Sequence, residues 1–142
     1  MSSTTKSYTM TTTLNRGYED SVADTRKALT DVGFGVLTEI DIQTTLKNKL
    51  GVDVPAQIIL GACRPPLAHR ALEAEPSVAA LLPCNVVVRD IGSGQTVVEV
   101  IDPEMMMSVT SAPALAEVAA EAKDRLQKAL LALGGTAAQV TA

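Results

Sequence analysis

Two cysteines and the single histidine of the chain lie within one stretch, residues 58–85. Cys63 ends an apolar run typical of a strand, Cys84 begins another such run, and His69 lies between them. If the two strands run antiparallel, the cysteines meet at one end of the sheet, within reach of His69. Thiolate and imidazole are ligands of Zn²⁺ and Cu(I). The pattern therefore predicts neighbouring cysteines and a metal or small-ligand site at Cys63, His69 and Cys84.

Packing is the plainer interpretation of the same cysteines. Cysteine is among the most buried residue types, and the separation of Cys63 and Cys84 does not match a C-x-x-C motif. Structural zinc also prefers four ligands, and the stretch supplies three. We therefore weigh packing ahead of metal binding. Met105, Met106 and Met107 follow a later strand, where a thioether can serve either as a soft ligand or as a flexible core filler.

Catalysis is the weaker interpretation of these residues. His69 has Glu73 four positions later, a local carboxylate partner on a helix. A Cys–His nucleophilic pair is conceivable, but no oxyanion site and no third activating residue can be identified. No residue is therefore assigned a catalytic role.

Charged residues beside this stretch complete the candidate ligand-binding set, which is Cys63, Arg64, His69, Cys84 and Glu39. Glu39 shares a strand face with Asp41, although Asp41 also suits the N-cap of the helix that follows and Glu39 then faces water. Arg64 and Arg70 can form a small anion site, or ordinary surface ion pairs with nearby glutamates.

Composition limits the class of protein. A chain of 142 residues with 46% hydrophobic and 2% aromatic residues predicts one domain, 1–142, with an aliphatic core. A net charge of −4, a pI near 4.9 and no basic patch argue against nucleic-acid binding. The N-terminus lacks a secretion signal and no apolar run is long enough to span a membrane. We therefore expect a cytoplasmic protein with reduced thiols and no membrane partner.

Hydrophobic periodicity predicts alternating strands and helices. Strands are expected over 8–14, 34–40, 57–62, 84–91 and 95–101, and helices over 18–32, 42–50, 65–75, 103–107 and 112–133, with Ser111 as the last N-cap. Residues 1–6 and 135–142 are expected to be disordered or frayed. The hairpin before the long last helix indicates an α+β domain, with a mainly antiparallel sheet of about five strands and helices packed on one face.

Three motifs, in order along the chain, resemble a known family. GFGVLTEIDIQTTLKNKLGV (33–52), ILGACRPPLAHRALEAEP (59–76) and LLPCNVVVRD (81–90) look like signatures of the domain of unknown function 302 family. The resemblance implies a fold like that of the TATA-box-binding protein, one β-α-β-β-β-β-α unit, and a homodimer. Arg64 departs from the asparagine of the family motif. A shared fold does not imply DNA binding.

These observations favour a homodimeric module that binds or senses a small ligand or a metal ion, with zinc or copper as the candidate metals. The alternatives are a thiol-dependent redox protein or enzyme using Cys63 or Cys84, and a purely structural dimerisation domain.

Overall fold

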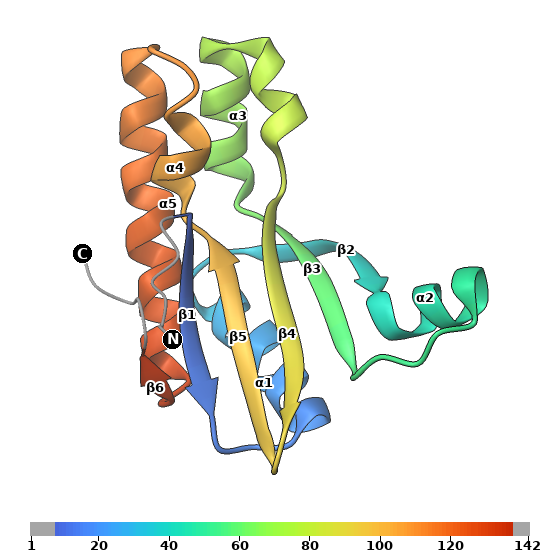
Figure 1. Ribbon diagram of the computed structural model, residues 1–142. Helices are drawn as coiled ribbons and strands as arrows, with labels where there is room; N and C mark the ends of the chain where they lie inside the picture. Colours follow the sequence, from blue (N-terminus) through green and yellow to red (C-terminus); the bar gives the residue numbers. More distant parts are fainter. Residues whose placement is uncertain (1–7, 138–142) are drawn as a thin grey trace.

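The computed structural model describes residues 8–137, so the predicted disorder of residues 1–6 lies outside it (Figure 1). In chain order the elements are β1 (Thr9–Leu14), α1 (Tyr18–Asp31), β2 (Gly35–Asp41), α2 (Ile42–Leu50), β3 (Gln57–Cys63), α3 (Pro65–Ala74), the 3-10 helix η1 (Pro76–Leu81), β4 (Cys84–Gly92), β5 (Gln95–Ile101), α4 (Pro103–Met107), α5 (Pro113–Ala132) and β6 (Thr136–Ala137). Within this range no helix is long and apolar enough to cross a membrane.

The strands form one antiparallel sheet in the order β2-β3-β4-β5-β1-β6. The predicted antiparallel sheet is therefore confirmed, and β4 and β5 form the expected hairpin. The prediction of a frayed tail from residue 135 is wrong for β6, which pairs with Thr12 and Thr13 of β1. Gly134 adopts a left-handed conformation, with φ of 76°, and this turn returns the chain to the edge of the sheet.

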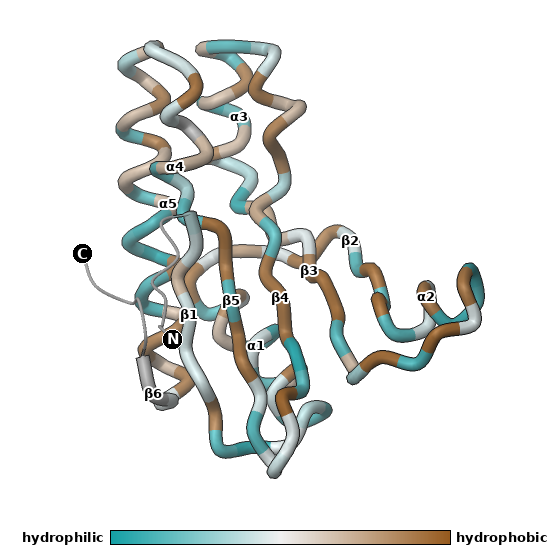
Figure 2. The backbone as a smooth tube through the Cα atoms, in the orientation of Figure 1, coloured by the Kyte–Doolittle hydropathy of each residue, from teal (hydrophilic) through white to brown (hydrophobic). Residues whose placement is uncertain are grey.

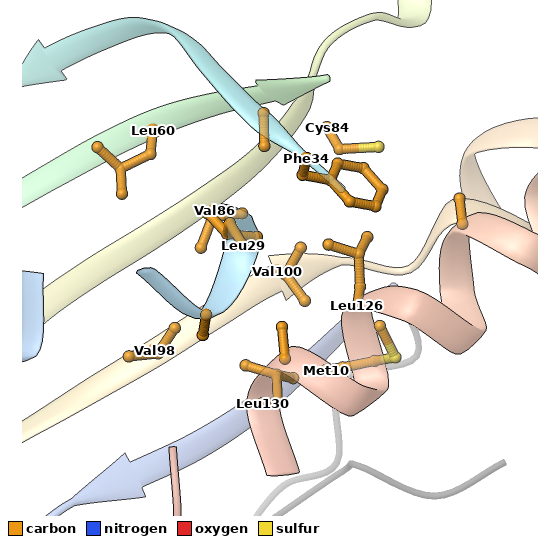
Figure 3. Close-up of a cluster of buried hydrophobic side chains, with 14 of the residues drawn as sticks. Met10, Leu29, Phe34, Leu60, Cys84, Val86, Val98, Val100, Leu126 and Leu130 are labelled. Atoms are coloured by element: carbon orange, nitrogen blue, oxygen red, sulfur yellow. The ribbon is translucent and has the colours of Figure 1, made fainter. Parts of the chain in front are cut away.

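Helices cover one face of this sheet (Figure 1). α1 lies behind β4 and β5, α5 runs along β1, and α3 and α4 pack against α5 beyond the end of the strands. The core between these layers is almost wholly aliphatic, as the composition predicts, with Phe34 as its aromatic member. Figure 3 shows Val86, Val98 and Val100 of the sheet facing Leu126 and Leu130 of α5.

α5 contributes a continuous buried stripe. Its buried residues are Leu115, Val118, Ala119, Ala122, Leu126, Ala129 and Leu130, as the periodicity predicts. Its N-cap is Ala112 and not the predicted Ser111, because Pro113 takes the first helical position, for which its fixed φ is suited. No side-chain hydrogen bond caps this end of the helix.

α2 has good local signals but no tertiary cover. The Asp41 carboxylate accepts a hydrogen bond from the Thr44 backbone N–H, and Gly51 ends the helix in a left-handed conformation, both as expected. None of its residues is buried, and Leu50 is 69% exposed. Figure 1 shows α2 projecting away from the body of the domain beside β2 and β3.

We predict that shortening Leu126 to alanine destabilises the fold by about 2–5 kcal/mol, because it removes a fully buried side chain from the seam between α5 and the sheet. Urea unfolding followed by circular dichroism measures the change. Leu131→Ala on the same helix is the control, since Leu131 is 60% exposed and its loss should change stability by less than about 0.5 kcal/mol. Equal losses for the two variants would contradict the packing described.

Candidate functional site

The two cysteines are neighbours at one end of the sheet. β3 and β4 pair antiparallel with Ala62 opposite Cys84, so Cys63 lies next to the residue that faces Cys84. Both cysteines are free thiols, and Cys84 is buried while Cys63 is half-buried. The prediction that they are neighbours is confirmed.

Both cysteines border a small hollow on the helix side of the sheet, which we call the cysteine cavity. Its volume is about 40 Å³. It is lined by Phe34, Ala62, Cys63, Arg64, Leu67, Ala68, Ala71, Cys84, Pro103, Met106, Val118, Ala119 and Ala122. The space is suited to a single atom or ion and not to an organic ligand.

His69 does not join the cysteines. Its side chain is 74% exposed, and its Nε2 lies 3.8 Å from the Glu73 carboxylate, the partner expected from their spacing. His69 is two residues from Leu67 and from Ala71, which form the buried side of α3, so it points to the opposite side of that helix. In the described part of the chain, no group of three or more His, Cys, Asp or Glu side chains could hold a metal ion. The predicted set of Cys63, His69 and Cys84 is therefore not assembled.

Burial makes the two thiols poor nucleophiles. It raises the pKa of Cys84 to about 11, with a smaller contribution from the nearby Cys63. Burial also raises the pKa of the Cys63 thiol. Reactive cysteines have a lowered pKa, because the thiolate is the attacking species. These environments therefore favour the packing interpretation over a redox or nucleophilic role.

The other predicted ligand residues have partners within the fold. Glu39 forms an exposed ion pair with Arg26 of α1. The Arg64 guanidinium donates to the Gly33 carbonyl at 3.4 Å, and its Nε lies 3.8 Å from the Glu121 carboxylate.

Arg70 and Arg125 also pair with Glu121, and the Arg125 Nε donates to it at 3.0 Å. The Arg70 guanidinium lies 3.5 Å from the Glu117 carboxylate and 3.6 Å from the Glu121 carboxylate. Ion pairing, the alternative to an anion site, is therefore the arrangement observed for Arg64 and Arg70.

A larger hollow, which the sequence did not indicate, lies at the end of the sheet where β1 and β4 begin and β5 ends. This sheet-face pocket has a volume of about 400 Å³. It is lined by Tyr8, Thr9, Leu81, Pro83, Asn85, Val87, Glu99, Val100, Ile101 and Met106. Thr9, Asn85, Val87, Glu99 and Ile101 alternate along their strands with buried residues that face the helices. Half of the lining residues therefore belong to the face of the sheet that carries no helix.

Glu99 is the best-anchored polar group of this pocket. The Thr9 hydroxyl donates to one carboxylate oxygen at 2.6 Å, and the Arg89 guanidinium donates to the other at 3.1 Å. These partners come from β1 and β4, the strands on either side of β5, and the Glu99 side chain is only 15% exposed. Charge-assisted hydrogen bonds from both sides hold the carboxylate in one orientation. One sequence signal could have indicated this pocket. Glu99 lies between the apolar residues Val97 and Ile101 on the same face of a strand.

The fold defines an α+β domain whose single antiparallel sheet is covered by helices on one side. The family described as "Domain of unknown function DUF302" matches residues 10–133, and the chain belongs to this family. The chain is also similar to the crystal structure of an uncharacterized conserved protein DUF302 from Bacillus stearothermophilus. The identity is 30%, the TM-score is 0.80, and the match covers 88% of this chain and 97% of that chain. Among curated proteins, none matches the chain.

We predict that Cys84 is modified slowly by a thiol reagent at pH 7. A pKa raised from 9.0 to about 11 leaves roughly 100-fold less thiolate than an unperturbed thiol has, and burial slows access further. Alkylation by iodoacetamide, followed by mass spectrometry from pH 7 to pH 11, measures the rate. The alkylation rate of Cys84 in the folded protein should rise with pH across this window. When urea unfolds the protein, alkylation should become fast at any of these pH values.

The Cys63→Ser variant isolates Cys84 and is the control for the neighbouring thiol. Rapid alkylation of Cys84 in this folded variant at pH 7 would contradict the prediction and restore the redox interpretation.

Proposed function

We propose that the chain is a small-ligand-binding module and that its ligand lies in the sheet-face pocket. The observation that carries the proposal is the Glu99 carboxylate, which is mostly buried and held from two sides beside a hollow of about 400 Å³. This volume lies within the range of small-molecule sites, which combine apolar walls with a few placed polar groups. Leu81, Val87 and Ile101 supply such walls.

The polar groups of the pocket define the class of ligand. An ionised carboxylate only accepts hydrogen bonds, and each Glu99 oxygen retains acceptor capacity beyond its present partner. The exposed side chain of Asn85 adds an amide beside the apolar lining. We therefore propose a mostly apolar small molecule that carries a cationic or hydrogen-bond-donating group.

Binding is favoured over catalysis. The raised pKa values of Cys63 and Cys84 weigh against a thiol-dependent enzyme or redox protein. His69, the general base expected to pair with a thiol, is exposed and lies away from both cysteines. We propose no catalytic residue. The free thiols support a reducing compartment, so a cytoplasmic location remains part of the proposal.

Self-association is a second part of the proposal. β2 is the last strand on its side of the sheet, and its outer edge has no strand partner in the described part of the chain. The exposed apolar residues on and beside it are Leu37, Ile40, Leu50 and Val52. Figure 2 shows hydrophobic segments along β2 and α2, away from the body of the domain. An unpaired strand edge with exposed apolar residues on and beside it supports a homodimer in which a second copy covers β2 and α2. The likeness to the TATA-box-binding protein stays a prediction.

A matched pair of ligands tests the pocket. We predict that hexylammonium binds and that hexanoate, with the same number of carbons and the opposite charge, does not. Glu99→Gln keeps the shape of the side chain and should weaken hexylammonium binding about 10- to 100-fold, because a hydrogen bond to a charged group is lost. NMR chemical-shift titration measures the affinity and locates the ligand.

Glu39→Gln is the control, since Glu39 is an exposed carboxylate outside the pocket. The Glu39→Gln variant should bind hexylammonium with the affinity of the unsubstituted protein. Equal binding of the two ligands, or equal effects of the two substitutions, would refute the pocket assignment.

The dimer is tested by substitutions on its proposed surface. We predict that the protein sediments as a dimer and that Leu37→Glu and Leu50→Glu convert it to a monomer, because each places a charge on the apolar contact. Sedimentation velocity measures the mass. Val109→Glu is the control, since Val109 is exposed in the segment between α4 and α5 and should leave the dimer intact. A monomeric unsubstituted protein contradicts the prediction.

A further inference from the structure

We propose that Cys63, Cys84 and Met106 form a binding site for one Cu(I) ion in the cysteine cavity. This site shares only Met106 with the sheet-face pocket and does not depend on a ligand there. It replaces the exposed His69 of the predicted metal set with a thioether.

The three sulfur-bearing residues come from three elements that meet at this corner. Cys63 is the last residue of β3, Cys84 is the first residue of β4, and Met106 lies in α4. All three border the same cavity of about 40 Å³. Figure 3 shows the Cys84 side chain beside Phe34 in the core. The cavity has room for one ion.

The position of Cys63 at the end of its strand matters. Successive residues of a regular strand point to opposite faces, and Ala62 faces the core opposite Cys84. At Arg64 the chain leaves the sheet and enters α3, so Cys63 also borders the helix-side cavity.

The ligand set selects the metal. Thiolate and thioether are soft ligands and suit Cu(I), whereas Zn²⁺ in structural sites takes four nitrogen or sulfur ligands. Among the described residues, no histidine, further cysteine or carboxylate lies where it could join the two thiols as a third ligand. Cu(I) would bind two thiolates and the thioether, and the two thiol protons would pass to solvent.

Arg64 places a cation at the border of the same cavity. Its Nε makes no hydrogen bond among the described residues and lies 3.8 Å from the Glu121 carboxylate, at ion-pair distance. Because Glu121 also pairs with Arg70 and Arg125, it is shared among three guanidinium groups. Two thiolates on a monovalent ion carry one net negative charge, which the guanidinium would balance. The apolar walls, which include Phe34 and Leu67, would keep water from the ion.

Anaerobic titration with Cu(I), against a chromophoric chelator as competitor, tests the site. We expect one equivalent to bind, with only sulfur neighbours in the X-ray absorption spectrum of the complex. Cys63→Ser and Cys84→Ser should each weaken binding by more than the 10- to 100-fold typical of losing an outer-shell partner. The absence of stoichiometric binding, or nitrogen ligands in the spectrum, would overturn the proposal.

A pair of methionine substitutions keeps the test independent of misfolding. Met106→Leu conserves volume and should weaken Cu(I) binding about 10-fold or more, whereas Met105→Leu should not, because Met105 is 41% exposed and does not border the cavity. Urea unfolding of the metal-free variants confirms that each folds. Equal affinity of the two leucine variants would overturn the three-sulfur site.

Two further variants separate this site from the other proposals. His69→Ala and Glu99→Gln should both leave Cu(I) affinity unchanged, since neither residue borders the cavity. Loss of Cu(I) binding in His69→Ala would overturn the proposal in favour of a site that includes the histidine.

Discussion

The pairing of β3 with β4 is the constraint on which the rest of the structure depends. Its register sets Ala62 opposite Cys84 and Gly61 opposite Asn85. Gly61 is required there, because a Cβ atom would lie 2.2 Å from the Thr38 hydroxyl oxygen and 2.9 Å from Pro83. The missing side chain lets Thr38 of β2 and Pro83, just before β4, pack closely over β3. The cysteine cavity and the sheet-face pocket both lie at that end of the sheet, with Met106 on the wall of each.

The two hollows differ because helices cover only one face of the sheet. On the covered face, α3, α4 and α5 leave a cavity for one ion and keep the thiols protonated by burial. The other pocket is about ten times larger and is bordered by a carboxylate held by two neighbouring strands. We propose a soft metal ion for the first and a small organic molecule for the second, and the two linings share only Met106.

Local sequence signals predicted most of the fold. The buried stripe of α5, the Asp41 cap, the β4–β5 hairpin and the family motifs all gave correct elements, because periodicity, capping and turn chemistry act over a few residues. Errors arose where a neighbouring element decides the outcome. Pro113 displaced the Ser111 cap, and pairing with β1 ordered Thr136 and Ala137 as β6. The stripe of α2 was amphipathic, yet no part of the described domain buries it.

The sequence by itself determined the fold class, the family and the proximity of the two cysteines, since antiparallel pairing brings the end of one strand beside the start of the next. Only the tertiary structure decided which side chains accompany them. The rotation of α3 turns His69 to solvent, while the packing of α4 on α5 brings Met106 to the cavity. Glu99 likewise acquires Thr9 and Arg89 only through strand register, because the partners are 90 and 10 residues away along the chain.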